Sequence, residues 1–179
     1  MFITFIIPSL GRPSLNKAID SLDNLNSDDW KAIVVLDGVE KDIQHEKVKV
    51  IQSEKIGSAG LLRNIAMQEV DTKWIGFLDD DDILYSRYID ELKLEDDYHK
   101  ELGFVLFRMM RDRIIPRPGL YDVVQGQVGI SFAIKNELVK QHDLKFVKSG
   151  PEDFHFLKNM VDLGIKGKVS DYVAYGVRK

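Results

Sequence analysis

The sequence predicts an α/β protein with a mostly parallel β-sheet that helices cover on both faces. Short apolar runs follow one another in the first half of the chain, and nearly every one is too apolar for a strand with one face in water. Between these runs, apolar residues recur at the spacing of an amphipathic helix. Strands that alternate with helices in this way form parallel sheets with helices on both sides.

Residues 1–82 form the more regular half of the predicted fold. Strands are expected at Phe2–Ile7, Ala32–Leu36, Val48–Ile51 and Trp74–Leu78, and helices at Ser14–Leu25 and Gly57–Val70. Pro8 should lie just past the end of the first strand, because proline cannot donate a ladder hydrogen bond. Ligands of such sheets bind beyond the carboxyl ends of the strands. Pro8, Asp37 and Asp79–Asp82 are all expected at these ends, so they should face one cleft.

Residues 83–179 are less regular and predict a short, mixed second half. An exposed acidic helix is expected at Ser86–Lys100, paired strands at Phe104–Met109 and Arg113–Pro116, a strand at Val128–Lys135, helices at Asn136–His142 and Glu152–Leu163, and a last strand at Val169–Tyr175. No internal repeat and no linker rich in proline, glycine and serine divides the chain. Residues 1–179 are therefore predicted to form one domain.

The composition excludes several classes of protein. The chain has no cysteine, which rules out a disulfide scaffold, a Cys-ligated metal site and thiol catalysis, and fits a reducing compartment. The net charge of -4 argues against a nucleic-acid partner, because that affinity needs many basic contacts to phosphates. No apolar run approaches the ~20 residues that span a membrane, and the first run lacks the basic residues of a signal peptide. We expect a cytoplasmic protein without a transmembrane segment.

The acidic run Asp79–Asp82 is the strongest chemical signal in the sequence. It follows the apolar run WIGFL directly, at the predicted ligand edge of the sheet. Adjacent carboxylates repel one another, and a divalent cation such as Mn²⁺ or Mg²⁺ would offset their charge while it binds phosphate oxygens. The alternative is a solvated turn, or acids that cap the next helix, and Asp82 fits capping best.

Other segments supply further candidate residues. Asp37, in VVLDGV, can accept hydrogen bonds from a base or a ribose, although an Asp-Gly turn is the commoner explanation. In GSAGLLRN, Gly60 is a small residue that would let a ligand approach the backbone, and Arg63 near a helix N-terminus would favour a diphosphate. A glycine-rich helix start with a surface arginine explains the same segment. Asp153 follows a glutamate at a predicted helix start, where it is either a general base or a cap.

Taken in order, these segments resemble the family 2 glycosyltransferases of the GT-A fold, a Rossmann-like architecture. The resemblance rests on FIIPSLGRP, VVLDG, GSAGLLRN, FLDDDD and GPEDFHFL. It implies a nucleoside-diphosphate sugar as donor, and UDP is the usual nucleotide of the family. It also implies that residues 1–82 bind the nucleotide and that residues 83–179 form a reduced acceptor side.

The resemblance implies a role for most of the candidate residues. Pro8 would border the nucleoside, Asp37 would bind the base, and Arg63 would approach the base or the diphosphate. Asp79 or Asp80 would lie near the ribose.

In the same resemblance, Asp81 would hold Mn²⁺ or Mg²⁺ against the diphosphate. Asp153 would be the base of an inverting transfer to an acceptor hydroxyl, whose carrier (saccharide, lipid-linked or protein) is unknown. The Q-x-x-R-W motif of processive synthases is absent, since the tryptophans are Trp30 and Trp74, so a single hexosyl transfer is expected. The last stretch, DYVAYGVRK, has no histidine that could complete a metal site.

Two other functions fit parts of the sequence. A haloacid-dehalogenase-like phosphatase would use Asp79 as nucleophile and Asp81 as general acid. That family carries the motif on its first strand, whereas here it follows the fourth, and Ile83 stands where that family has threonine or valine. A nucleotide-binding module of the same fold without turnover is the second alternative.

Overall fold

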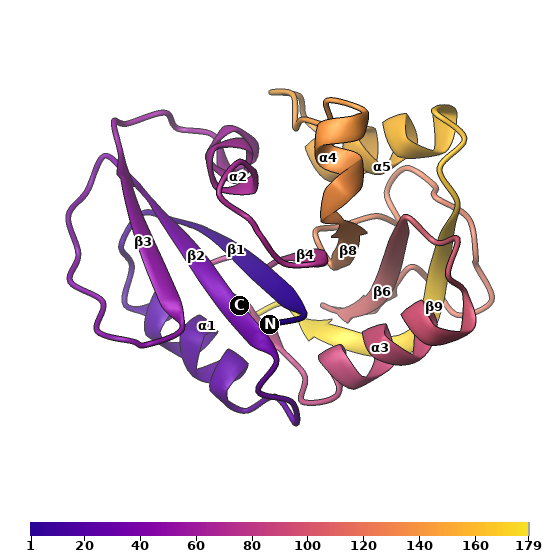
Figure 1. Ribbon diagram of the computed structural model, residues 1–179, viewed down its shortest axis with the longest axis horizontal. Coiled ribbons are helices and arrows are strands. Elements are labelled where there is room, and N and C mark those ends of the chain that lie inside the picture. Colours follow the sequence, from indigo (N-terminus) through magenta and orange to yellow (C-terminus); the bar gives the residue numbers. More distant parts are fainter. Residues whose placement is uncertain (179) are drawn as a thin grey trace.

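The computed structural model describes residues 1–178 and places their strands in one nine-stranded sheet (Figure 1). The strands are β1 (Ile3–Ser9), β2 (Trp30–Asp37), β3 (Val48–Ser53), β4 (Trp74–Phe77), β5 (Ile83–Leu84), β6 (Phe104–Met110), β7 (Ile114–Ile115), β8 (Phe132–Lys135) and β9 (Gly167–Gly176). The helices are α1 (Ser14–Asp23), α2 (Ala59–Met67), α3 (Tyr88–Tyr98), α4 (Asn136–Gln141) and α5 (Glu152–Asp162). Helices α2, α4 and α5 cover one face of the sheet, and α1 and α3 cover the other (Figure 1).

The strand order is β3-β2-β1-β4-β8-β6-β9-β5, with β7 paired to β6. The first four of these strands run parallel, β8 runs antiparallel to its neighbours β4 and β6, and β9 is again parallel to β6. This arrangement confirms the predicted α/β fold with a mostly parallel sheet. Since β1, β2 and β4 are parallel neighbours, their carboxyl ends meet at one edge.

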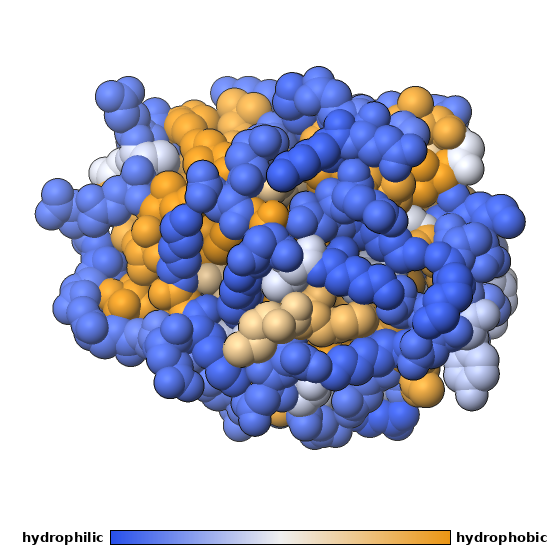
Figure 2. Space-filling view, viewed as in Figure 1, coloured by the Kyte–Doolittle hydropathy of each residue, from blue (hydrophilic) through white to orange (hydrophobic). Residues whose placement is uncertain are grey.

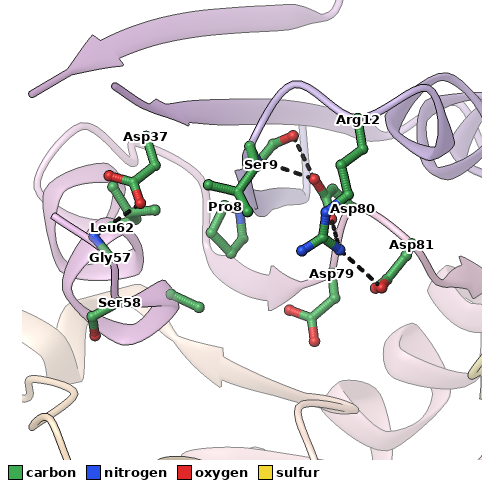
Figure 3. A pocket seen from close by; sticks show the side chains of 12 residues that line it. Pro8, Ser9, Arg12, Asp37, Gly57, Ser58, Leu62, Asp79, Asp80 and Asp81 are labelled. Carbon is green, nitrogen blue, oxygen red and sulfur yellow. Dashed lines mark hydrogen bonds and ion pairs between the residues drawn. The ribbon is translucent and has the colours of Figure 1, made fainter. Parts of the chain in front are cut away.

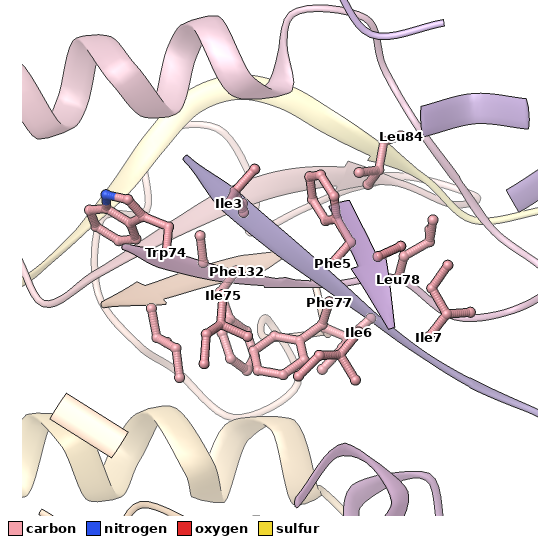
Figure 4. Close-up of a cluster of buried hydrophobic side chains, with 14 of the residues drawn as sticks. Ile3, Phe5, Ile6, Ile7, Trp74, Ile75, Phe77, Leu78, Leu84 and Phe132 are labelled. Carbon is pink, nitrogen blue, oxygen red and sulfur yellow. The ribbon is translucent and has the colours of Figure 1, made fainter. Parts of the chain in front are cut away.

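The core lies on both faces of β1 and β4 (Figure 4). Every residue of these two strands is buried, which explains why their sequences are apolar without alternation. On one face the ring of Phe77 packs edge-on against those of Phe132 and Phe146, with centroids 5.2 and 5.4 Å away. On the other face Phe5 packs against Tyr88, whose helix α3 closes that side of the core. Figure 2 shows apolar side chains among the mostly hydrophilic ones on the surface over β3 and α2. β3 is an edge strand, so no further strand of the sheet covers its outer side.

Three sequence predictions differ from the structure in detail. Pro8 lies inside β1 and is paired with Val35, and it is not past the strand end. The β1–β4 pairing stops at Ile6 and Phe77, so Pro8 stands where β1 has a neighbour on one side, which tolerates the missing N–H. The acidic helix begins at Tyr88 and is half buried, because Tyr88, Ile89 and Leu92 form an apolar face that its many acids obscure.

The strand predicted from Val128 begins at Phe132. The Phe132 N–H bonds to the carbonyl of Ile130, a local turn that takes the preceding backbone out of the ladder. Ser131 still fixes this segment to β6 through its hydroxyl, which donates to the carbonyl of Phe107 at 2.7 Å.

Gly76 is the position in β4 where the sheet has no room for a side chain. A Cβ there would lie 2.7 Å from the Phe5 ring and 3.1 Å from Cδ1 of Ile3. We expect Gly76→Ala to lower the free energy of unfolding by about 1–3 kcal/mol through overpacking. Gly150→Ala is the control, since a Cβ at Gly150 meets no atom within 4 Å. Equal urea midpoints for the two variants would contradict this packing.

Candidate functional site

A cleft of about 340 Å³ opens at the carboxyl ends of β1, β2 and β4, against the N-terminus of α2 (Figure 3). Its walls combine backbone-exposing small residues with carboxylates: Pro8, Ser9, Leu10, Arg12, Asp37, Gly57, Ser58, Ala59, Leu62, Asp79, Asp80 and Asp81. The structure therefore brings together Pro8, Asp37 and three members of the acidic run, as the topology predicted.

Asp37 ends β2 and is almost fully buried. Its two carboxylate oxygens accept the backbone N–H groups of Ile56 and Gly57, at 2.5 and 2.9 Å. Gly57 has φ +69°, a conformation that favours glycine and turns the chain into α2. Ser58 then caps the helix by accepting the N–H of Leu61. Asp37 thus fixes the helix N-terminus that forms one wall of the cleft.

Asp80 fastens the loop after β1 to the loop after β4. It is buried, and its Oδ2 accepts the hydroxyl of Ser9 at 2.6 Å and the N–H of Leu10 at 3.3 Å. Asp81, by contrast, is half exposed at the cleft, with its Oδ2 3.2 Å from the Arg12 guanidinium. The adjacent carboxylates therefore have different tasks: Asp80 is structural, and Asp81 is accessible to a ligand.

Arg63 lies behind the cleft and joins it to α5. The side chain is buried, and its guanidinium contacts Asp79 Oδ1 at 2.5 Å, Glu152 Oε1 at 3.1 Å and Asp153 Oδ1 at 3.5 Å. Burial alone would lower the pKa of Arg63, but the nearby carboxylate charges of Asp79, Asp153 and Glu152 outweigh it, and the pKa is raised. Arg63 is therefore a permanent cation shared by the acidic run and the Glu-Asp pair.

Gly60 does not line the cleft. It is buried in α2, where a Cβ would lie 2.6 Å from Glu152 Oε2 and 2.9 Å from Cβ of Phe146. The small residue makes room for the approach of α5 and its glutamate.

Asp153 lies in the first turn of α5, beside a second cleft of about 570 Å³. The two clefts share Gly57–Ala59 and Asp79 in their walls, so they meet at the acidic run. Burial raises the pKa of Asp153 to about 6; Arg63 opposes this, and the charges of Asp79 and Glu152 add to it. The Oδ1 of Asp153 is buried 3.5 Å from the Arg63 guanidinium and makes no hydrogen bond among the described residues, while the side chain as a whole is 26% exposed. A carboxylate in this state can accept a proton near neutral pH.

Asp82 does not cap a helix, so that interpretation was wrong. Its Oδ1 accepts the N–H of Arg178 at 3.0 Å, and it also bonds to the hydroxyl of Tyr175. The same hydroxyl accepts the N–H of Asp79 at 3.0 Å. Burial raises the pKa of Asp82 to about 6, chiefly because the carboxylate loses water. The end of β9 thus holds the acidic turn in shape.

Sequence reasoning missed Ser9, Arg12 and Tyr175. Ser9 ends β1 and Arg12 follows it, so both lie at the same sheet edge as the acidic run, which was a usable signal. Tyr175 is distant in sequence and is recognised through the strand order alone.

The sequence matches the family described as "Glycosyl transferase family 2" over residues 4–113, more than half of the chain. The chain belongs to glycosyltransferase family 2. No curated protein matches it. Membership confirms the resemblance drawn from the ordered motifs and removes the phosphatase alternative.

Solved glycosyltransferase structures share the fold of this family 2 chain. Residues 1–349 of S. aureus TarS match with TM-score 0.81 at 19% identity, over 99% of this chain and 60% of that one. Their complex with UDP-GlcNAc matches with TM-score 0.80 at 18% identity, over 100% and 59%. The mannosyltransferase PcManGT from Pyrobaculum calidifontis, with GDP-Man and Mn²⁺, matches with TM-score 0.75 at 14% identity, over 96% and 55%. These likenesses confirm the GT-A fold. The chain covers no more than 60% of the length of the TarS chains that it matches.

The donor set at the cleft fits a magnesium- or manganese-type cation. Residues 1–178 contain no group of three His, Cys, Asp or Glu side chains arranged to hold a metal. Such cations, however, bind through one or two carboxylates and complete their shell with water and substrate phosphates. The half-exposed Asp81 offers that kind of contact.

No helix among residues 1–178 is long and apolar enough to cross a membrane.

Proposed function

We propose that this chain transfers a sugar from a nucleoside-diphosphate sugar to an acceptor hydroxyl with inversion, and that Asp153 is the base. The observation that carries the proposal is the meeting of two clefts at Asp79, one walled by the acidic run and the other by Asp153. The relatives with bound UDP-GlcNAc and GDP-Man support a sugar nucleotide as donor. We further propose that the nucleotide is UDP and that the sugar is a hexose. The enzyme would transfer one sugar to each acceptor and would not build a polymer.

The first cleft would bind the donor. Pro8 and the N-terminus of α2 would border the nucleoside, and Asp37 can accept a further hydrogen bond from the base because each carboxylate oxygen has a second lone pair. Asp79 or Asp80 would lie near the ribose. Arg63 acts behind this cleft, where it holds Asp79 in place.

Asp81 would hold the divalent cation in the proposed site. When bound, such a cation neutralises charge on the leaving diphosphate. The protein contributes the remaining steps through its own groups. Asp153, whose side chain is 26% exposed at the second cleft, accepts the proton of the acceptor hydroxyl while that hydroxyl attacks the anomeric carbon opposite the diphosphate. The C–O bond to the nucleoside diphosphate breaks as the new one forms, which inverts the configuration.

The raised pKa of Asp153 predicts the acidic limb of the pH profile. Transfer needs the ionised carboxylate, so kcat/KM should rise with pH and level off above about 6, the pKa of Asp153 in the free protein. Steady-state rates between pH 4.5 and 8 test this. A profile that is flat down to pH 4.5 would show that Asp153 is not the base.

A thermal-shift experiment tests the donor and cation sites together. We expect UDP or GDP with Mn²⁺ to raise the melting temperature more than either alone, because the joint site exists in the folded state. Asp81→Asn should remove the Mn²⁺-dependent part and leave the melting temperature of the free protein nearly unchanged, since Asp81 is half exposed. A full Mn²⁺-dependent shift in Asp81→Asn would refute the assignment of the cation to Asp81.

A further inference from the structure

Arg12 is a half-exposed arginine in the wall of the donor cleft, and the loop that carries it is firmly held. Asp80 binds the start of that loop through Ser9 and Leu10. The Nζ of Lys41 donates to the carbonyls of Gly11 and Arg12, at 3.1 and 3.3 Å. The backbone of Arg12 is therefore fixed, while its guanidinium remains accessible.

The guanidinium lies between two carboxylates of unequal accessibility. Its Nη1 is 3.5 Å from Oδ1 of Asp80 and 3.2 Å from Oδ2 of Asp81. Figure 3 marks both ion pairs with dashed lines. Asp80 is buried and already accepts other hydrogen bonds, so it stays in place. The side chains of Arg12 and Asp81 are 49% and 52% exposed, and an ion pair of such groups is weak enough to be broken.

We propose that Arg12 is a displaceable counter-ion of Asp81 that makes binding of the divalent cation and of the donor diphosphate interdependent. Without donor, Arg12 neutralises Asp81 and competes with the cation. A diphosphate in the cleft gives the guanidinium a partner that its planar fork matches better than one carboxylate oxygen. Asp81 is then released to the cation, whose shell the diphosphate oxygens help to complete. This role rests on the proposed function of Asp81.

The competition predicts that Mn²⁺ alone binds more tightly when Arg12 is neutral. We expect Arg12→Gln to tighten binding of Mn²⁺, in the absence of nucleotide, by about threefold to fivefold, the strength of an exposed ion pair. Electron paramagnetic resonance of free Mn²⁺ measures this without turnover. Lys49→Gln is the matched control. It removes the same charge from an ion pair with Glu69 of similar exposure, 55% and 50%, outside the donor cleft.

Titration with UDP, and with GDP in parallel, completes the test. In the wild type Mn²⁺ should tighten UDP or GDP binding, and the same factor must apply to Mn²⁺ binding when the nucleotide is present. This coupling factor should fall in Arg12→Gln and persist in Lys49→Gln. Unchanged or weaker Mn²⁺ binding by Arg12→Gln, with binding lost in Asp81→Asn, would overturn the role of Arg12 and leave the cation at Asp81. Wild-type Mn²⁺ binding by Asp81→Asn would overturn both assignments.

Discussion

Asp153→Asn is expected to reduce kcat by about 10²–10⁴, the usual contribution of a general base. The asparagine keeps the shape of the side chain but cannot take the proton of the acceptor. Because Asp153 lines the second cleft and not the donor cleft, the affinity for nucleoside diphosphate with Mn²⁺ should stay within about twofold of wild type. Initial rates and calorimetric titration measure the two quantities separately.

Asp162→Asn is the matched control for this loss, because Asp162 is an exposed carboxylate at the other end of α5, paired with Lys158. It should transfer sugar at the wild-type rate. If Asp153→Asn retained more than a tenth of wild-type kcat, another group would have to be the base. If it lost donor affinity in the same proportion as its rate, Asp153 would belong to the donor site instead.

Arg63→Met should destabilise the fold by about 3 kcal/mol. Removal of one partner of a buried ion pair usually costs about 3–5 kcal/mol, and the lower end applies because the carboxylates keep some contact with water. Methionine fills the space beside Phe146 but leaves the negative charges of Asp79, Glu152 and Asp153 facing one another. Urea unfolding at pH 7.5 measures the loss.

The pH dependence of this loss identifies its cause. Without Arg63 the clustered carboxylates should bind protons more readily when folded than when unfolded. Stability gained from a raised carboxyl pKa is present at low pH and is lost as pH rises, so the deficit should shrink toward pH 5. Arg87→Met, which breaks an exposed pair with Glu91, should change stability by less than about 1 kcal/mol. A deficit in Arg63→Met that is equal at pH 5 and pH 7.5 would mean lost packing instead of repulsion.

The elements of the parallel half were predictable because burial on both faces leaves a local trace in the sequence. The strands β1 and β4 are apolar except for Thr4 and Ser9, and they are buried along their whole length. The start and the burial of the helix at Tyr88 were harder to predict, since its apolar face has three residues and most of its other residues are acidic or polar. The start of β8 depends on a turn at Ile130 that periodicity does not record.

The position of the acidic run was predictable, but the separate tasks of its members were not. The four aspartates are identical in the sequence, whereas the role of each carboxylate depends on the residue, distant in sequence, that it contacts. Arg63 forms an ion pair with Asp79, Ser9 donates a hydrogen bond to Asp80, and Tyr175 bonds to Asp82. These partners arrive from β1, α2 and β9, so the assignment needed the strand order. Capping, the local explanation for Asp82, failed for this reason.

Release of nucleoside diphosphate from sugar nucleotides is the most direct measurement of the proposed function. Purified protein with Mn²⁺ would be incubated with a panel of UDP- and GDP-sugars, with and without saccharide acceptors, and the released UDP or GDP quantified. The proposed function predicts release from at least one donor, dependent on divalent cation, stimulated by an acceptor and lost in Asp153→Asn. Binding of UDP or GDP with Mn²⁺ but no release from any donor would contradict it and identify a binding module without turnover.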